Sequence, residues 1–153
     1  MKTKYYIAYG SNMDERQMAF RCPHARLVGK SVVDGYELLF KGSLTGSYAT
    51  IEPNKNEFVP VLIWEITNSD EKSLDSYEGY PTFYYKKNIK VEVEGKEVTA
   101  MVYIMDEKRR LGIPSDRYFN VLKRAYQKFG FDYKILKKAY DNSKEVINEN
   151  DKA

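Results

Sequence analysis

The feature that most constrains this chain is residues 5–13, YYIAYGSNM, where a predicted strand changes abruptly into a turn. Aromatic and β-branched residues favour the strand as far as the glycine. The Gly-Ser-Asn of residues 10–12 favours a turn and a helix N-terminus, because glycine permits backbone angles closed to other residues and the two polar side chains cap helices. Acidic residues then open a short predicted helix that runs to about residue 22.

A strand that feeds a tight turn and a helix start leaves backbone N–H groups without partners at the turn. Such groups form a site for a carboxylate or an oxyanion. The same pattern also occurs as a plain structural turn, which is the simpler interpretation of these residues taken alone. The functional interpretation gains weight only from a second stretch, residues 74–81, LDSYEGYP.

Length and the scarcity of metal-binding side chains limit the classes of protein to consider. A chain of 153 residues most simply forms one domain with a sizeable core, here predicted as residues 1–140 followed by a polar tail at 141–153. No run of 18 apolar residues predicts a membrane span, and the N-terminus leads into a strand without a signal-peptide pattern. Cys22 and His24 are the only cysteine and histidine, so we expect no disulfide, no metal site and a cytoplasmic location.

Positive charge is concentrated toward the C-terminus. The net charge is +3, but residues 106–140 hold ten Lys and Arg residues against four Asp and Glu residues. A basic helical patch of this kind is one signature of nucleic-acid binding, whereas a solvated helix face is the more ordinary interpretation. We therefore expect no nucleic-acid partner, and both a monomer and a homodimer stay open.

The chain taken in order predicts an α+β fold, with six or seven strands in an antiparallel or mixed sheet that curls into a barrel. The Asp-Gly pair at residues 34–35 predicts a hairpin turn. Residues 58–66 are apolar on both faces, as in a central or barrel strand. Gly79 and Gly130 should end two helices, and the last helix should fray from Asn142. The predicted strands after the first are residues 25–33, 36–40, 48–51, 58–66, 84–94 and 98–105, and the predicted helices after the first begin near residues 69, 115 and 133.

One carboxylate stands out in the second stretch. Glu78 lies at the predicted end of a helix, where the helix dipole disfavours a negative charge. Tyr77, Tyr80 and the Phe-Tyr-Tyr of residues 83–85 would exclude water and raise the pKa of Glu78 toward the range useful for general acid–base catalysis. A surface glutamate at a helix end is the ordinary alternative. Because no nucleophilic triad or phosphate-binding loop is visible, an enzyme built here would use one carboxylate and an anion site, without a metal or a covalent intermediate.

Three motifs in this order resemble the gamma-glutamylcyclotransferase family, including its plant-defence-protein-like branch. The motifs are YGSN at residues 9–12, LDSYEG at 74–79 and PSDRY at 114–118, and the resemblance runs from residue 6 to about residue 138. The version EGYP at residues 78–81 looks like the bacterial branch. The resemblance implies a mixed, mostly antiparallel β-barrel of about six or seven strands with flanking helices.

The resemblance also implies a reaction and the residues that perform it. The α-amine of a γ-glutamyl amine or amino acid attacks its own γ-carbonyl and releases 5-oxoproline and the free amine, with no cofactor. Glu78 corresponds to the family's catalytic carboxylate, which acts as general acid and base. The substrate-binding residues of the family correspond to Tyr6, Ile7, Ala8, Tyr9, Gly10, Ser11, Asn12 and Tyr118. Tyr118 also fits an apolar helical stripe, so a purely structural role is its alternative.

A second hypothesis from another class stays open: a non-catalytic binding module of the same fold, which would use the retained pocket or the basic C-terminal helices. Glu78 discriminates between the two, because a degenerate module is free to lose the carboxylate, whereas here it stands in an intact motif. We expect residues 42–48 and 80–85 to surround the amine half of the substrate, whose identity the motifs leave open.

Overall fold

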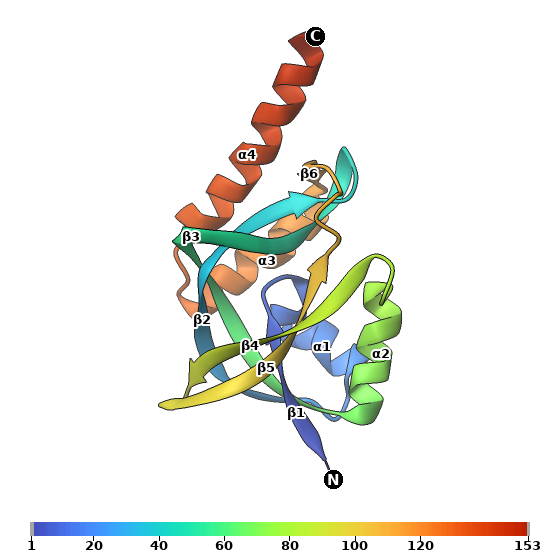
Figure 1. The fold of residues 1–153 in the computed structure, drawn as a ribbon, viewed down its shortest axis with the longest axis vertical. Coiled ribbons are helices and arrows are strands. Elements are labelled where there is room, and N and C mark those ends of the chain that lie inside the picture. Colours follow the sequence, from blue (N-terminus) through green and yellow to red (C-terminus); the bar gives the residue numbers. More distant parts are fainter. Residues whose placement is uncertain (1, 153) are drawn as a thin grey trace.

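The computed structural model of the protein describes the backbone of residues 2–152 and the side chains of residues 2–146 (Figure 1). Within these residues a six-stranded sheet is accompanied by α-helices and one short 3-10 helix. In chain order the elements are β1 (Thr3–Ala8), η1 (Ser11–Met13), α1 (Glu15–Arg21), β2 (Arg26–Lys41), β3 (Thr45–Thr67), α2 (Asn68–Glu78), β4 (Tyr84–Val93), β5 (Lys96–Met105), β6 (Ile113–Pro114), α3 (Asp116–Phe129) and α4 (Tyr133–Lys152).

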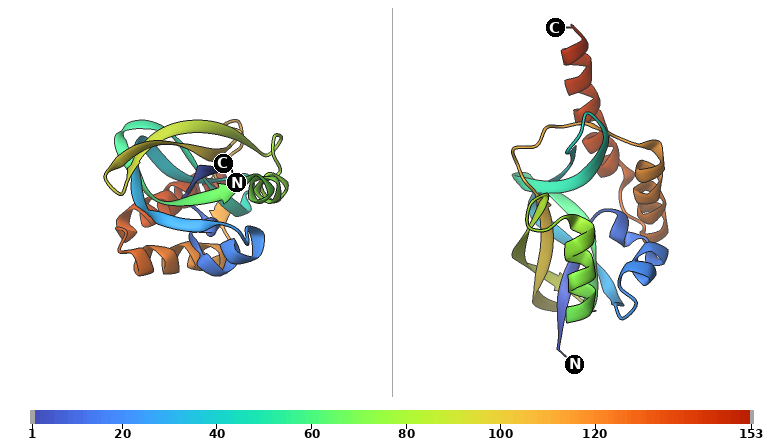
Figure 2. Two further views of the ribbon diagram at one scale, coloured as in Figure 1. Left: turned by 90° about the horizontal axis from the view of Figure 1, so that it is seen from below. Right: turned by 90° about the vertical axis from the view of Figure 1, so that its right-hand side faces the viewer.

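The sheet is mixed, and its strands curl around the core (Figure 2, left). The strand order is β2-β3-β1-β5-β4, and the short β6 pairs with β3. β1 runs antiparallel to β3 and parallel to β5, while the long β2–β3 and β4–β5 pairs are antiparallel. The two outer strands also approach each other: the hydroxyl of Ser31 on β2 donates a hydrogen bond to the carbonyl of Glu92 on β4 at 2.5 Å. The predicted α+β fold with a curled, mostly antiparallel sheet is confirmed.

Two long strands replace four short strands of the prediction. The expected hairpin turn at residues 34–35 was wrong, because β2 runs through both residues and pairs with β3 on either side of them. Gly35 has a φ of 76° and lies at a shift in register, so the glycine produces a bulge instead of a reversal. β3 likewise continues past Pro53, where we expected a strand to end. Pro53 pairs with Tyr36 and Phe58 pairs with Asp34, so the register of the β2–β3 pair shifts between these two positions.

Helix boundaries follow local capping chemistry, as predicted. Thr67 and Asp70 form a reciprocal capping box at the start of α2, and Gly79 ends this helix with a φ of 65°. The hydroxyl of Ser115 caps α3, which ends at Gly130 with a φ of 72°. Because α2 is fixed at both ends, its last helical residue, Glu78, has a defined place relative to the sheet.

The last helix departs from the prediction for the C-terminus. α4 continues to Lys152 and projects beyond the barrel, although we expected fraying from Asn142 (Figure 1). Within this stretch Ser143 is fully buried and donates a hydrogen bond to the carbonyl of Phe40 on β2 at 3.1 Å. This contact joins residues far apart in the sequence, which a polar pattern does not reveal. The division into a domain of residues 1–140 and a tail of residues 141–153 stays a prediction.

The core lies inside the curled sheet. Residues 59–64 of β3 are all buried, as expected for a barrel strand that is apolar on both faces. α2 lies on a different side of the barrel from α3 and α4 (Figure 2). In the described part of the chain, no helix is both long enough and apolar enough to cross a membrane.

Candidate active site

A pocket of about 310 Å³ opens where β1 ends, η1 begins and α2 ends. Tyrosine is its commonest wall residue, and Glu78 is the only carboxylate among its described lining residues. The lining consists of Tyr6, Ile7, Tyr9, Gly10, Ser11, Asn12, Tyr48, Ala49, Ser76, Tyr77, Glu78, Gly79, Phe83, Tyr84, Tyr103 and Tyr118. The pocket therefore unites the three motifs found in the sequence.

The predicted turn forms one wall, with a single exception. Ala8 is not a lining residue, because its short side chain is buried and the residue pairs with Leu62 of β3. Gly10 has a φ of −120°, so it does not use the positive φ that glycine favours. It provides space instead: a Cβ at this position would lie 3.1 Å from the Tyr118 hydroxyl and 3.6 Å from the Cβ of Ala49.

The turn leaves two backbone donors without a partner among the described residues. The N–H of Met13 bonds to the carbonyl of Gly10 at 3.0 Å, which closes the first turn of η1. The N–H groups of Ser11 and Asn12 have no acceptor among the described residues, and both residues line the pocket. Two free N–H groups on consecutive residues favour the binding of an anion.

Asn12 is held from three directions. Its amide nitrogen donates to the hydroxyl of Tyr6 at 2.8 Å, and its amide oxygen accepts a hydrogen bond from the Arg21 guanidinium at 2.5 Å. Its backbone carbonyl accepts from the indole N–H of Trp64 at 3.1 Å. The turn is therefore fixed by α1 and β3 as well as by its own hydrogen bonds.

Glu78 reaches the pocket from the last turn of α2. Burial raises the pKa of its carboxyl to about 7, and the positive charge of Arg21 opposes part of this rise. The predicted direction of the pKa change is thus confirmed, with desolvation as its main cause. Tyr85, which we expected near Glu78, instead donates its hydroxyl to Glu107 and does not line the pocket.

The tyrosines that surround Glu78 stay neutral, and some of them use their hydroxyl groups in hydrogen bonds to the backbone. Burial raises the pKa of Tyr9, Tyr84 and Tyr118 above the ordinary tyrosine value. The hydroxyl of Tyr84 donates to the carbonyl of Ala49 at 2.8 Å, and the hydroxyl of Tyr118 accepts from the N–H of Ala49 at 3.1 Å. Neutral phenols of this kind shape the pocket but do not accept a proton near neutral pH.

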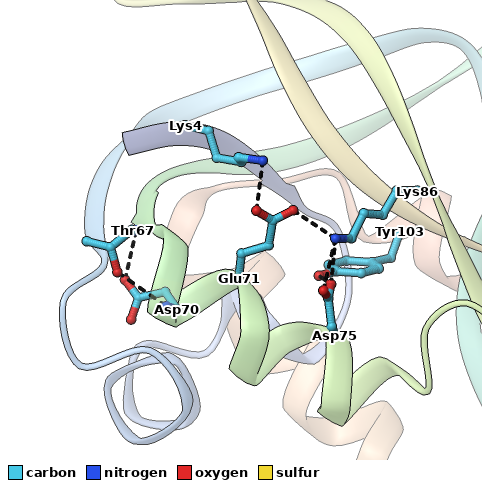
Figure 3. A network of polar contacts seen from close by, with 7 residues as sticks. All are labelled: Lys4, Thr67, Asp70, Glu71, Asp75, Lys86 and Tyr103. Atoms are coloured by element: carbon cyan, nitrogen blue, oxygen red, sulfur yellow. Dashed lines mark hydrogen bonds and ion pairs between the residues drawn. The ribbon is translucent and has the colours of Figure 1, made fainter. Parts of the chain in front are cut away.

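An ionic network beside the pocket fixes α2 to the sheet (Figure 3). Lys86 of β4 pairs with Glu71 and Asp75 of α2, each at 2.8 Å, and the hydroxyl of Tyr103 donates to Asp75 at 2.5 Å. Residues 71, 75 and 78 share one face of a helix, because they are four and three residues apart. The network therefore orients the face of α2 that carries Glu78.

Some lysines of the basic C-terminal segment form ion pairs with other elements of the fold. Lys128 pairs with Glu15 at 2.6 Å, and Lys138 pairs with Glu57 at 2.5 Å. These ion pairs fit the prediction of a solvated helix face. In the described chain, no cluster of three or more His, Cys, Asp or Glu side chains is arranged to hold a metal ion.

Sequence reasoning found the segments that bear the pocket better than its individual wall residues. Tyr48, Phe83 and Tyr84 lie in the two segments that we expected around the amine half of the substrate. Tyr103 and Arg21 were missed. Tyr103 is one aromatic residue in an apolar strand, and Arg21 is an ordinary basic residue at a helix end, so neither carried a signal in the sequence.

The comparisons with known proteins point to one family. The sequence model of the family described as "Gamma-glutamyl cyclotransferase, AIG2-like" matches residues 6–120. A mouse (Mus musculus) gamma-glutamylcyclotransferase is 31% identical over 130 residues, which cover 79% of this chain and 69% of that protein. A bovine (Bos taurus) gamma-glutamylcyclotransferase is 30% identical over 145 residues, which cover 87% of this chain and 75% of that protein. A solved structure named gamma-glutamyl cyclotransferase superposes with a TM-score of 0.80 at 25% identity, covering 90% of this chain and 86% of the other.

Proposed function

Because this chain belongs to the gamma-glutamyl cyclotransferase, AIG2-like family of enzymes, we propose that it converts a γ-glutamyl amine or γ-glutamyl amino acid into 5-oxoproline and the free amine. The α-amine nitrogen forms a bond to the γ-carbonyl carbon, the amide C–N bond breaks, and one proton passes from the attacking nitrogen to the leaving nitrogen. The reaction consumes no water and no oxidant. The observation that carries the proposal is a single carboxylate with a pKa of about 7, placed in a pocket beside two free backbone N–H groups.

Glu78 supports the proton transfers of this reaction. The attacking α-amine must lose a proton, and the leaving amine must gain one. A carboxyl with a pKa of about 7 populates both protonation states near neutral pH, so it accepts the first proton and delivers the second. The pocket tyrosines do not compete as bases, since burial raises their pKa values.

The turn supports binding and orientation. The N–H groups of Ser11 and Asn12 are suited to the α-carboxylate of the substrate or to the oxyanion that develops during attack. Holding the γ-glutamyl chain bent brings the amine to its own carbonyl, and orientation of this kind supplies a large share of the rate in ring closures. Tyr6, Ile7, Tyr9, Gly10 and Tyr118 complete this wall in the proposal.

The amine half of the substrate leaves through the aromatic side of the pocket. Tyr48 is 47% exposed and Tyr77 is 46% exposed, and both line the pocket, so they stand at its mouth. Phe83 packs edge-on against Tyr48, with ring centroids 6.5 Å apart.

A cytoplasmic location, a small-molecule substrate and a monomeric or homodimeric state stay part of the proposal.

The test is a screen of γ-glutamyl amino acids and γ-glutamyl amines with 5-oxoproline detected by mass spectrometry. At least one compound should be cyclised, and Glu78→Gln should lower the turnover number on the order of a hundredfold or more, the contribution expected of a general base. Glu92→Gln is the matched control, because Glu92 is an exposed glutamate on β4 that does not line the pocket. Binding of γ-glutamyl compounds without any turnover would establish the binding module in place of the enzyme.

A further inference from the structure

Arg21 is the last residue of α1, and its side chain turns back onto the turn of residues 10–12. Its guanidinium donates to the amide oxygen of Asn12 at 2.5 Å and to the hydroxyl of Ser11 at 3.5 Å. The first bond is short and charge-assisted, which makes it one of the stronger hydrogen bonds in the site. Arg21 therefore holds the two residues whose backbone N–H groups are free.

The same guanidinium contacts the helix that carries the carboxylate. Its central carbon lies 3.5 Å from the ring centroid of Tyr77, which immediately precedes Glu78 in α2. The hydroxyl of Tyr77 in turn lies 3.4 Å from the hydroxyl of Ser11. A planar cation that stacks on an aromatic ring and donates sideways at the same time is a property of arginine that lysine does not share. Arg21 thus joins the turn to the end of α2.

Arg21 is also the cation whose charge acts on Glu78, where it lowers the pKa of the carboxyl. No carboxylate of the described residues lies within ion-pair distance of the guanidinium, so its charge is not neutralised by a salt bridge. The titratable groups around Glu78 are Tyr6 from β1, Tyr9 just after β1, Tyr84 from β4, Tyr118 from α3, Tyr77 from α2 and Arg21 from α1. Of these, Arg21 is the cation.

We propose that Arg21 is a positioning residue of this site, which holds the anion-binding turn against the end of α2 and supplies the positive charge that stabilises ionised Glu78. The inference rests on the proposed function, in which the turn binds substrate and Glu78 exchanges protons. A simpler role would be to complement the dipole at the C-terminal end of α1. That role predicts no effect on the ionisation of Glu78, so the two interpretations differ in their pH dependence.

The experiment compares Arg21→Gln, Arg21→Lys and the control Arg16→Gln, which removes a charge from an exposed residue of the same helix. Turnover number, KM and their ratio are measured across a pH range from about 5.5 to about 9.5, which brackets the ionisation of a carboxyl tuned for general acid–base catalysis. Arg21→Gln should move the acidic limb of kcat/KM upward by about half a pH unit to one pH unit, because a partly exposed opposite charge is removed from near a carboxylate. Arg21→Lys should keep the limb in place but raise KM several-fold, because it retains the charge without the fork and the stacking. Arg16→Gln should change neither.

A second readout does not depend on activity. The ¹³C carboxyl signal of Glu78, assigned by its loss in Glu78→Gln, is titrated in the wild-type protein and in the Arg21 variants. A titration midpoint that is higher in Arg21→Gln but not in Arg21→Lys supports the proposal, even if the protein cyclises none of the γ-glutamyl compounds. Failure of the proposed reaction is thereby distinguished from failure of this inference. Equal titration midpoints in wild type and Arg21→Gln, or an unchanged KM in Arg21→Lys, would overturn it. Should Arg21→Gln not fold, Arg21→Met takes its place in the titration, with the same expected rise in midpoint and the same overturning result.

Discussion

Replacing Glu78 by Gln should make the folded protein more stable at alkaline pH and leave its stability nearly unchanged at acidic pH. The ordinary pKa of a glutamate is 4.5, which describes the unfolded chain, whereas burial raises the pKa of Glu78 to about 7 in the folded protein. The folded state therefore binds this proton more tightly than the unfolded state. As the pH rises from 4.5 to about 7, the wild-type protein loses stability, because the unfolded chain releases this proton and is favoured by ionisation while the folded protein still holds the proton.

The magnitude follows from the difference between the folded and unfolded pKa values of Glu78. A tenfold change in proton affinity corresponds to about 1.4 kcal/mol, so a rise of the pKa from 4.5 to about 7 gives an upper value of about 3.4 kcal/mol. The carboxylate faces a pocket open to water, which screens part of this effect. We expect a difference of about 2–3 kcal/mol above about pH 8, and little difference near the ordinary glutamate pKa. Gln has nearly the same shape as protonated Glu, which is why the two proteins converge at low pH.

Urea unfolding of wild type, Glu78→Gln and Glu92→Gln at about pH 4.5 and about pH 8.5 measures this prediction. The difference between Glu78→Gln and wild type should grow by about 2–3 kcal/mol between the two pH values, and all other titrating groups cancel in the comparison. Glu92→Gln should show no such growth, since Glu92 is exposed. A Glu78→Gln difference that is the same at both pH values would refute the claim that Glu78 is desolvated in the folded protein.

Three further substitutions separate the roles of the turn and its neighbours. Tyr118→Phe removes the acceptor of the buried Ala49 N–H, so it should lower the free energy of unfolding by about 1–3 kcal/mol and reduce turnover only modestly; lower stability in urea with unchanged kinetics would mean a purely structural Tyr118. Gly10→Ala should lower the melting temperature slightly, because φ is already negative, but lower kcat/KM at least about tenfold, since the new methyl group would meet the Tyr118 hydroxyl. Ser11→Ala should lower kcat/KM less than Gly10→Ala does. An equal loss in the two variants would mean that the Ser11 hydroxyl, and not the backbone N–H groups, binds the substrate.

Helix ends and the β4–β5 hairpin were predictable because local chemistry determines them. Asp70 lies three residues after Thr67 in a capping box, and Gly79 occupies a left-handed conformation at the end of α2. Residues 93–96 form a tight connection between strands that alternate in the sequence. In each case the residues that fix the structure are within a few positions of one another.

The long strands β2 and β3 were not predictable in the same way. Gly35 and Pro53 carry signals that normally end a strand, yet here they lie at shifts in the register of a continuous pair. A glycine at positive φ suits a bulge as well as a hairpin, and both choices leave the same local sequence pattern. Only the pairing with a partner strand decides between them, and the residues of that partner lie well outside the local sequence window.

The site divides along the same line. Glu78 and the turn were found because they lie in short motifs, whereas Trp64 and Tyr103 were missed because their contacts reach across the fold. Arg21 was missed because a basic residue at a helix end carries no motif. Trp64 donates to the carbonyl of Asn12, 52 residues away, and Tyr103 donates to Asp75, 28 residues away. Residues that position a site have no pattern of their own in the sequence, since any element that packs beside the site can supply them.

The pocket wall has two uses, and these link the stability of the fold to the proposed activity. Ala49 is bonded through its N–H to Tyr118 and through its carbonyl to Tyr84, so these two tyrosines hold β3 in place while they line the pocket. The burial that they create raises the pKa of Glu78 to about 7, and the same burial makes its ionised form unfavourable for the fold. A wall that was more open to water would remove the stability cost but would also return the carboxyl toward its ordinary pKa. The pH dependence of unfolding is therefore a measure of the property that would suit Glu78 for the proposed proton transfer, and its measurement needs no substrate.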